Sequence, residues 1–458
     1  MTPPSLTNED LQEIASCIEW GLPLPARFAS VFPKTKTVNH KDDHRIQELV
    51  QFGSGERGTL LAGDNLHAMD WLQSNPSKPI KLIYIDPPFD VGSDFNIPIR
   101  LPIGKAISHV AYSDTWGTGK NSFIHMLAPR LKAMIDLLDE NGSIVVHCDY
   151  RTVATIRTML DRFLGPEHFR NEIIWHYTGG GRAKKYFSRK HDSLLWYSKS
   201  DSYTFNIDAV RVPYKPTSGY ARGGIVSKSG KHYRPNPKGT PVDDVWDIPI
   251  INPMAKERVG YPTQKPIALL ERIINALSNE GDCVADFFCG SGTTLVVADR
   301  LNRHWVGADL SSAAITSTHF RLFDGSYRLM DLSSQSSSGV LKPLQAAQIN
   351  ATVHTETTDL ILKVSAFQPK SLLGLSEKTF CLKSGLLHLL DGECVMNDSL
   401  DWLQGWILCE PESGQCIAHG QGRPDNIRIP NVRLKAVQLT LIDLVGGFHQ
   451  RTLDVCHV

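Results

Sequence analysis

The sequence predicts an α/β protein built on a doubly wound, mostly parallel sheet, followed by a small all-β domain. Apolar strand-like runs alternate with helical patterns between residues 58 and 330. A Ser-rich linker at 331–345 ends this alternation, and only short strands separated by turns follow at 346–458. Alternating strands and helices are typical of a parallel sheet covered on both faces, whereas short strands between turns indicate a β-sandwich.

Residues 1–57 are expected to form a helical lead-in, because Ile14 and Ile18 continue an apolar stripe at helical spacing. The next elements alternate regularly. Short apolar runs predict buried strands, and apolar positions three or four residues apart predict helices. The expected strands are 60–64, 82–85 and 143–147, and the expected helices are 65–73, 123–138 and 152–163.

The pattern becomes less regular after residue 173. Two strands, 173–177 and 193–197, flank a run of glycines, and residues 205–255 are rich in Pro, Gly, Lys and Tyr. Periodicity then returns, and after the linker the chain contains only strands. The expected later elements are a helix at 267–277, a strand at 282–288, a helix at 293–301, a strand at 304–309, and C-terminal strands at 360–364, 405–409, 434–444 and 451–455.

Composition restricts the class of protein. A chain of 458 residues predicts two to three domains with a large core. Its apolar content of 41% is ordinary, and no run approaches the roughly 18 apolar residues of a membrane span. The N-terminus lacks the pattern of a secretory signal, and the nine cysteines include no C-x-x-C pair. We therefore expect a cytoplasmic protein without a disulfide framework or a zinc module.

The charge is zero overall but unevenly distributed. Residues 170–239 contain 14 Lys or Arg and 4 Asp or Glu, a balance of +10, whereas residues 341–458 contain 10 and 12, a balance of −2. A single basic stretch in a neutral protein favours a polyanion-binding surface over a solvated loop.

A glycine-rich segment at 286–294 follows one of the predicted strands. Gly290 and Gly292 allow the backbone to approach a ligand where a strand turns into a helix. Asp309 ends the next strand, where a carboxylate can bind ribose hydroxyls. Leu295 stands where dinucleotide folds have a third glycine, which disfavours a nicotinamide or flavin cofactor. The arrangement therefore predicts a different nucleotide-like cofactor.

The turn Asp86, Pro87, Pro88 and Phe89 directly follows the strand at 82–85. The Asp86 carboxylate and the Pro87 carbonyl can accept hydrogen bonds from the two hydrogens of an exocyclic amine, and Phe89 can stack on its ring. The amine of a base is a poor nucleophile because its lone pair is delocalised into the ring. Fixing both hydrogens favours a more nucleophilic geometry and stabilises the transition state. The four residues are therefore the predicted catalytic turn.

Together, these motifs make the chain resemble the DNA N6-adenine/N4-cytosine methyltransferase family in its permuted β-group order. In that order the catalytic turn at 86–89 precedes the basic region, and the segments at 261–266 and 286–294 follow it. The segment at 63–66 also resembles a family element, and the match covers about residues 58–330. The resemblance implies S-adenosylmethionine as cofactor. The expected cofactor-binding residues are Asp64, Thr263, Gln264, Lys265, Asp286, Phe288, Gly290, Gly292, Thr293 and Asp309.

The finer resemblance is to modification subunits of type III restriction systems and their stand-alone relatives. The Asp-Pro-Pro form of the turn favours N6 of adenine, and N4 of cytosine is the alternative. An RNA or protein amine methyltransferase and a non-catalytic DNA-binding subunit are further alternatives, which the motif order and the intact motifs disfavour. No Pro-Cys pair occurs, which disfavours methylation at carbon 5 of cytosine because that reaction needs a cysteine nucleophile.

The resemblance implies double-stranded DNA as substrate, with residues about 200–258 as a target-recognition insertion and a base flipped out to reach Asp86. It extends to a restriction subunit and a homodimer as partners. It also implies a cytoplasmic protein of prokaryotic or phage-like origin that is nucleoid-associated when bound to DNA. His147 and His176 lack zinc-site spacing and are expected in core or hydrogen-bonding roles. The candidate DNA-binding residues are Arg182, Lys184, Lys185, Arg189, Lys190, His191, Arg211, Lys215, Arg222, Lys228, Lys231 and Arg234.

Overall fold

The computed structural model describes most of the chain between residues 45 and 457. None of the helices in this part of the chain is long and apolar enough to cross a bilayer. The ranges that it describes are 45–76, 78–89, 92–100, 106–114, 120–179, 182–322, 325–333, 348–356, 359–368, 380–383, 386–389, 392–394, 403–413, 415–421, 427–429, 434–443 and 448–457.

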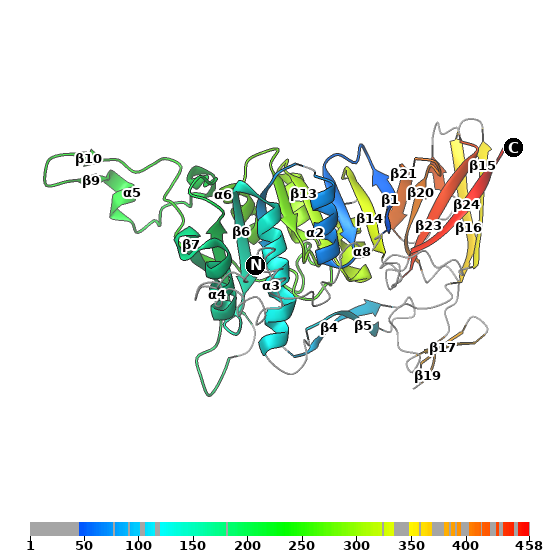
Figure 1. The fold of residues 1–458 in the computed structure, drawn as a ribbon, viewed down its shortest axis with the longest axis horizontal. Coiled ribbons are helices and arrows are strands. Elements are labelled where there is room, and N and C mark those ends of the chain that lie inside the picture. Colours follow the sequence, from blue (N-terminus) through cyan, green and yellow to red (C-terminus); the bar gives the residue numbers. More distant parts are fainter. Residues whose placement is uncertain are drawn as a thin grey trace, which may run out of the picture.

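The centre of the molecule is a ten-stranded sheet (Figure 1). Six of its nine strand pairs are parallel, which confirms the predicted mostly parallel sheet. In spatial order the strands are β1 (Arg45–Phe52), β14 (Tyr327–Ser333), β2 (Gly58–Ala62), β13 (His304–Asp309), β12 (Cys283–Asp286), β3 (Ile80–Ile85), β6 (Leu138–Cys148), β8 (His191–Ser198), β7 (Phe169–His176) and β11 (Val245–Asp247).

Helices cover both faces of this sheet, as the doubly wound arrangement requires. One apolar cluster packs α2 (Asn65–Ser74), α3 (Lys120–Leu137) and α4 (Val153–Leu164) against one face. A second cluster packs α6 (Ile267–Leu277), α7 (Thr293–Arg300) and α8 (Ser312–Arg321) against the other.

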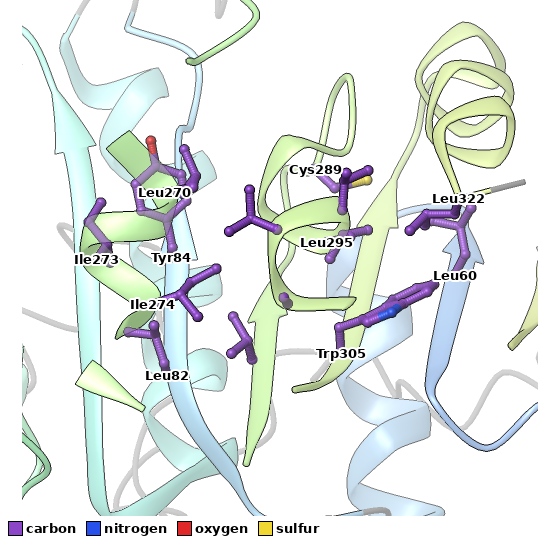
Figure 2. Packing of buried hydrophobic residues seen from close by; sticks show 14 of the residues in the cluster. Leu60, Leu82, Tyr84, Leu270, Ile273, Ile274, Cys289, Leu295, Trp305 and Leu322 are labelled. Atoms are coloured by element: carbon purple, nitrogen blue, oxygen red, sulfur yellow. The ribbon is translucent and has the colours of Figure 1, made fainter. Parts of the chain in front are cut away.

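The second cluster brings residues far apart in sequence together. Figure 2 shows Ile273 and Ile274 of α6 beside Leu82 of β3, with Trp305 of β13 farther along the sheet. Trp305 is only 1% exposed. Burying side chains of this size is the main force that fixes the layers.

The N-terminal lead-in is not helical where the structure describes it. Arg45–Phe52 forms β1, an edge strand that pairs antiparallel with β14. Its apolar side chains Leu49, Val50 and Phe52 are buried in the sheet's core, and this burial selects an extended segment over a helix. The expectation of helix is therefore wrong for this stretch, and residues 1–44 lie outside the described ranges. The linker was predicted to begin at residue 331, but β14 continues to Ser333. The linker prediction is therefore wrong for residues 331–333.

The insertion predicted at about 200–258 lies at the end of the sheet, where its own strand β11 pairs with β7. Figure 1 shows α5 (Gly219–Gly223) and the small hairpin of β9 (Ile225–Val226) and β10 (His232–Tyr233) reaching away from the body. Further short elements are the 3₁₀ turns η2 (Pro166–His168) and η3 (Ile207–Val210) and the hairpin of β4 (Asp94–Arg100) and β5 (Ala106–Ser113).

The elements that the structure describes in the C-terminal region are all β-strands, as predicted. Its seven-stranded sheet adjoins the opposite end of the central sheet, at β1 (Figure 1), where Gln51 bridges to Gln415. A three-stranded sheet is separate from it, and a two-layer sandwich stays a prediction. The strands are β21 (Cys416–Gln421), β20 (Leu403–Cys409), β23 (Ala436–Asp443), β24 (Phe448–His457), β15 (Gln348–Glu356), β16 (Asp359–Gln368) and β22 (Ile427–Ile429), with β17 (Phe380–Lys383), β18 (Leu386–Leu389) and β19 (Gly392–Cys394).

Candidate active site

Four aspartates lie at the carboxyl ends of four adjacent strands. Asp309 and Asp286 end β13 and β12, and Asp64 and Asp86 follow β2 and β3. These strands are neighbours and parallel, so their carboxyl ends meet at one edge of the sheet. All four aspartates line one cavity of about 390 Å³. Ligands of open α/β sheets bind at this edge.

The cavity contains most of the residues that the sequence assigned to catalysis and cofactor binding. Asp86 and Gly290 line it together, although they are separated by about 200 residues of sequence. Pro87, Phe89 and Gly292 do not line it. The predicted residues that do are Asp64, Asp86, Pro88, Thr263, Gln264, Lys265, Asp286, Phe288, Gly290, Thr293 and Asp309.

The glycine turn is fixed by local contacts on both sides. Gly290 and Gly292 have φ angles of +50° and +73°, a region that favours glycine. A Cβ at Gly292 would lie 2.4 Å from Oγ1 of Thr318 on α8. The N–H of Gly290 donates to Oδ2 of Asp309 at 2.8 Å. Gly292 is therefore required by packing against α8, and Gly290 faces the cavity.

Two carboxyls beside this turn, the buried Asp286 and the half-buried Asp309, have perturbed pKa values. Burial raises the pKa of Asp286 to about 7, although its oxygens accept hydrogen bonds from the Thr294 hydroxyl and the Phe288 N–H. Burial also raises the pKa of Asp309 to about 6, against hydrogen bonds from the backbone N–H groups of Ser311 and Gly290. A positive ligand in the cavity would favour the ionised form of both groups.

Asp64 belongs to a hydrogen-bonded network that the sequence did not reveal. Its Oδ1 accepts from the N–H of Leu66 and caps α2. Arg130 of α3 donates to Oδ2 of Asp64 at 2.8 Å and to Oδ1 of Asn65 at 2.6 Å. Asn65 in turn donates to the carbonyl of Phe287. An arginine within the predicted helix at 123–138 was the available signal.

The two oxygens of the Asp86 carboxylate have different surroundings. Oδ2 accepts a hydrogen bond from the Lys265 ammonium, which comes from the loop before α6. Oδ1 is buried and has no hydrogen-bond partner among the described residues. Buried polar atoms are nearly always paired, so an orphaned acceptor at the cavity points to a missing donor. Lys265, expected on the cofactor side, thus also contacts the predicted catalytic acid.

The turn after Asp86 is anchored by Asp114, a buried residue outside the predicted motifs. The N–H of Phe89 donates to Oδ2 of Asp114 at 3.1 Å, and Asp114 is 1% exposed. The Phe89 ring lies 5.8 Å from the His147 ring, centroid to centroid. Asp114 therefore fixes the position of the predicted stacking residue, although a lone Asp in a loop gave no sequence signal.

A chain of hydrogen bonds continues from this turn into the sheet. His147 of β6 is fully buried, and its Nδ1 lies 2.9 Å from the Tyr84 hydroxyl. Its Nε2 lies 3.2 Å from Oδ2 of Asp192, and Oδ1 of Asp192 accepts from the Tyr177 hydroxyl. The ring of Trp175 packs edge-on against His147. The expectation that His147 has a core or hydrogen-bonding role is confirmed.

The predicted DNA-binding residues fall into two groups. Those between 182 and 191 are exposed apart from Lys190, which donates to the Gly179 carbonyl. Arg189 stacks on the rings of Tyr150 and Tyr186 at 4.0 and 4.7 Å. Phe187 beside them is 99% exposed. This segment precedes β8, whose first residues include Asp192 near His147, so it lies beside the cavity's catalytic end.

The second group lies in the insertion, and its members are not all free to contact DNA. Arg211 donates to Oδ1 of Asp208 and to the carbonyl of Gly239, at 2.6 and 2.9 Å. It therefore stabilises the insertion itself. The exposed members of this group are Lys215, Arg222, Lys228, Lys231 and Arg234.

Comparisons with known proteins find a matching family model and several similar proteins. A family model described as DNA methylase matches residues 80–319. Type II methyltransferase M1.MboII of Moraxella bovis is 31% identical over 277 residues, which are 57% of this chain and 98% of the relative. DNA adenine methyltransferase YhdJ of Escherichia coli (strain K12) is 30% identical over 270 residues, 58% and 83% of the two chains. A structure titled as the M1.HpyAVI–SAM complex has a TM-score of 0.38 at 20% identity, covering 58% of this chain and 98% of that one.

Proposed function

We propose that this chain, which belongs to the N6-adenine/N4-cytosine DNA methylase family, transfers a methyl group to N6 of an adenine flipped out of duplex DNA. The chain is a DNA methyltransferase with S-adenosylmethionine as its cofactor. The choice of adenine, the flipped base and the residue roles are the proposal. The observation that supports it most is the orphaned Oδ1 of Asp86 on the cavity that also contains Gly290.

The charged and apolar residues that line the cavity fit the cofactor. When bound, the cofactor supplies a methyl group on a positively charged sulfur. Ionised Asp286 and Asp309 would balance that positive charge, and Asp309 and Asp64 offer acceptors to its hydroxyls or amines. The ring of Phe288 and the side chain of Leu310 supply apolar surface.

The catalytic turn would position the amine of the base. Oδ1 of Asp86 accepts one N–H, and the Pro87 carbonyl is the proposed acceptor of the other. Lys265 occupies Oδ2, so a single carboxylate oxygen is offered to the base. Asp114 holds Phe89 for stacking on the base. Orientation of this kind contributes most of its effect in the transition state, where charge develops on the nitrogen.

Adenine is favoured over cytosine by the Asp86 carboxylate in the turn and by the likeness to a named adenine methyltransferase. N4 of cytosine is the second candidate, because the matching family includes both chemistries. The finer resemblance to type III modification subunits stays a prediction, since M1.MboII is named a type II enzyme.

The surfaces proposed to bind DNA are the segment at 182–191 and the exposed cations of the insertion. A restriction subunit and a homodimer are proposed partners, which size-exclusion chromatography with light scattering and co-purification would test. A homodimer would elute at about twice the chain mass of 50.9 kDa.

The test uses methyl-labelled S-adenosylmethionine with duplex DNA, RNA and protein as acceptors. Methylated nucleosides from digested DNA, identified by mass spectrometry, separate N6-methyladenine from N4-methylcytosine. Asp86→Ala should abolish transfer while cofactor binding, measured by calorimetry, persists. Full turnover by that variant would contradict the assignment of Asp86, and label in cytosine alone would contradict the choice of base.

A further inference from the structure

The methylated amine must lose a proton, and in the proposed function Oδ1 of Asp86 is the acceptor in contact with it. That oxygen is itself buried, and the other carboxylate oxygen is occupied by an ammonium, which has no lone pair to accept a proton. A second base lies behind it, because Nδ1 of His147 lies 3.9 Å from Oδ1 of Asp86. The two side chains come from adjacent parallel strands, β3 and β6.

We propose that His147 and Asp192 form a relay that takes the proton from the methylated base through Asp86. This inference rests on the proposed function, because it assigns the proton that the transfer releases. His147 acts through Asp86 and does not touch the base, so it is a positioning and proton-accepting residue behind the catalytic turn.

Each proton and each electron pair in the step has a donor and an acceptor among the groups named. The base nitrogen bonds the methyl carbon with its lone pair as the carbon–sulfur bond breaks, leaving that bond's electron pair on sulfur. One N–H bond of the now positive nitrogen then breaks, and its electron pair returns to nitrogen. The proton passes to Oδ1 of Asp86 and from there to the lone pair of Nδ1 of His147. The imidazolium loses it to water after the product leaves.

The hydrogen bonds of His147 select the tautomer that this step needs. Asp192 is an anion that can only accept, so Nε2 carries the hydrogen and Nδ1 keeps its lone pair. Burial raises the pKa of Asp192, but hydrogen bonds from His147 and Tyr177 and the charge of Lys265 outweigh burial and leave that pKa below its ordinary value. Asp192 therefore remains charged and stabilises the imidazolium once it forms.

The Tyr84 hydroxyl can serve both protonation states of His147. It donates to Nδ1 while the ring is neutral and can rotate to accept from Nδ1–H when the ring is charged. The separation of 3.9 Å between Nδ1 and Oδ1 exceeds a hydrogen bond. Catalytic hydrogen bonds are often long without substrate and shorten in the complex, so a small rotation of either group closes the path.

Charged and titratable groups surround His147 on several elements. Tyr84 and Asp86 face it from β3, and Asp192 from β8, with the Tyr177 hydroxyl behind. Lys265, next to Asp86, also lowers the pKa of Asp192 by its charge. The rest of the ring's surroundings include the aromatic side chains of Phe89 and Trp175.

The experiment measures single-turnover methyl transfer to DNA across pH for the full chain and its variants. His147→Asn keeps a polar atom facing Tyr84 but cannot carry the proton. Its rate should fall about 100-fold, the usual scale for a lost acid–base group, with unchanged affinities for DNA and S-adenosylmethionine. The wild-type rate should rise with pH as one group loses its proton, and this rise should disappear in His147→Asn.

Two further variants separate a relay from a structural role. Asp192→Asn removes the charge that stabilises the imidazolium, so the rise of rate with pH should remain but move to lower pH. His319→Asn is the matched control, because His319 is also fully buried with Nδ1 2.6 Å from a tyrosine hydroxyl, that of Tyr327. It should retain both the rate and the rise with pH.

An unchanged rate in His147→Asn, or a slower rate with the same rise, overturns the relay. Should that variant fail to fold, an unshifted pH profile in Asp192→Asn overturns it equally. If Asp86→Ala abolishes transfer while His147→Asn does not, the relay fails and the proposed function stands. Absence of any transfer to DNA by the wild-type chain overturns both.

Discussion

Replacing Asp286 with asparagine tests how strongly burial raises the pKa of this acid, which lines the cofactor cavity. Asp286 is 2% exposed, and its pKa is raised to about 7 by burial. Asparagine has the same shape, can accept from the Phe288 N–H and can donate to the Thr294 hydroxyl. The variant therefore removes the charge and keeps both hydrogen bonds.

The expected effect follows from the pKa values of the folded and unfolded states. An unfolded Asp ionises near pH 4, so the shift of about three units corresponds to about 4 kcal/mol. Because the folded pKa is the higher one, the folded state holds the proton more tightly. The protein is therefore most stable below pH 4 with respect to this group, and it loses that stability as pH rises toward 7. Roughly half of the 4 kcal/mol is lost above pH 5.5.

The assay is urea unfolding followed by tryptophan fluorescence, since Trp305 lies on β13 beside Asp286's strand. The wild-type free energy of unfolding should fall by about 2 kcal/mol between pH 5.5 and 8.5 beyond the change seen in Asp286→Asn. At pH 8.5 the variant should be the more stable protein. Asp309 adds a slope of the same sign in both proteins, and the comparison removes it except for its coupling to the Asp286 charge. Equal slopes in the two proteins would refute the reasoning.

Two further predictions concern the cofactor turn and the insertion. Gly292→Ala should lower the free energy of unfolding by more than about 1 kcal/mol, because its Cβ would meet Thr318. Gly281→Ala, with φ of +81° but open space, should cost less, and equal losses would contradict the packing argument. Lys215→Ala should weaken DNA binding and reduce the salt dependence by about one charge. Arg211→Ala should mainly destabilise the insertion, and the reverse pattern in filter-binding and melting experiments would contradict this division.

Local patterns predicted the sheet because the strands that form its centre are short, apolar and bounded by turns. The runs before Asp86 and Asp286 needed no tertiary information, since their residues are buried on both faces whatever the neighbours. The segment at 45–52 was harder to predict as a strand. An edge strand carries polar residues toward solvent, and its pairing partner β14 lies about 280 residues away.

The catalytic turn and the glycine turn were identifiable because each is a contiguous motif. Arg130, Asp114 and Lys265's contact with Asp86 were not, because each depends on a partner distant in sequence. A single polar residue in a helix or loop has the same local pattern whether it faces water or a cavity. Only packing decides which.

The sequence by itself determined the order of the motifs, the class of fold and the acid that faces the cavity. Tertiary structure decided how those parts work together. It brought four strand ends to one edge, gave one oxygen of Asp86 to Lys265 and left the other without a partner. It also placed His147 behind that oxygen. The physical reason is that hydrogen bonding and burial are properties of neighbours in space, and parallel strands make neighbours of residues that are far apart along the chain.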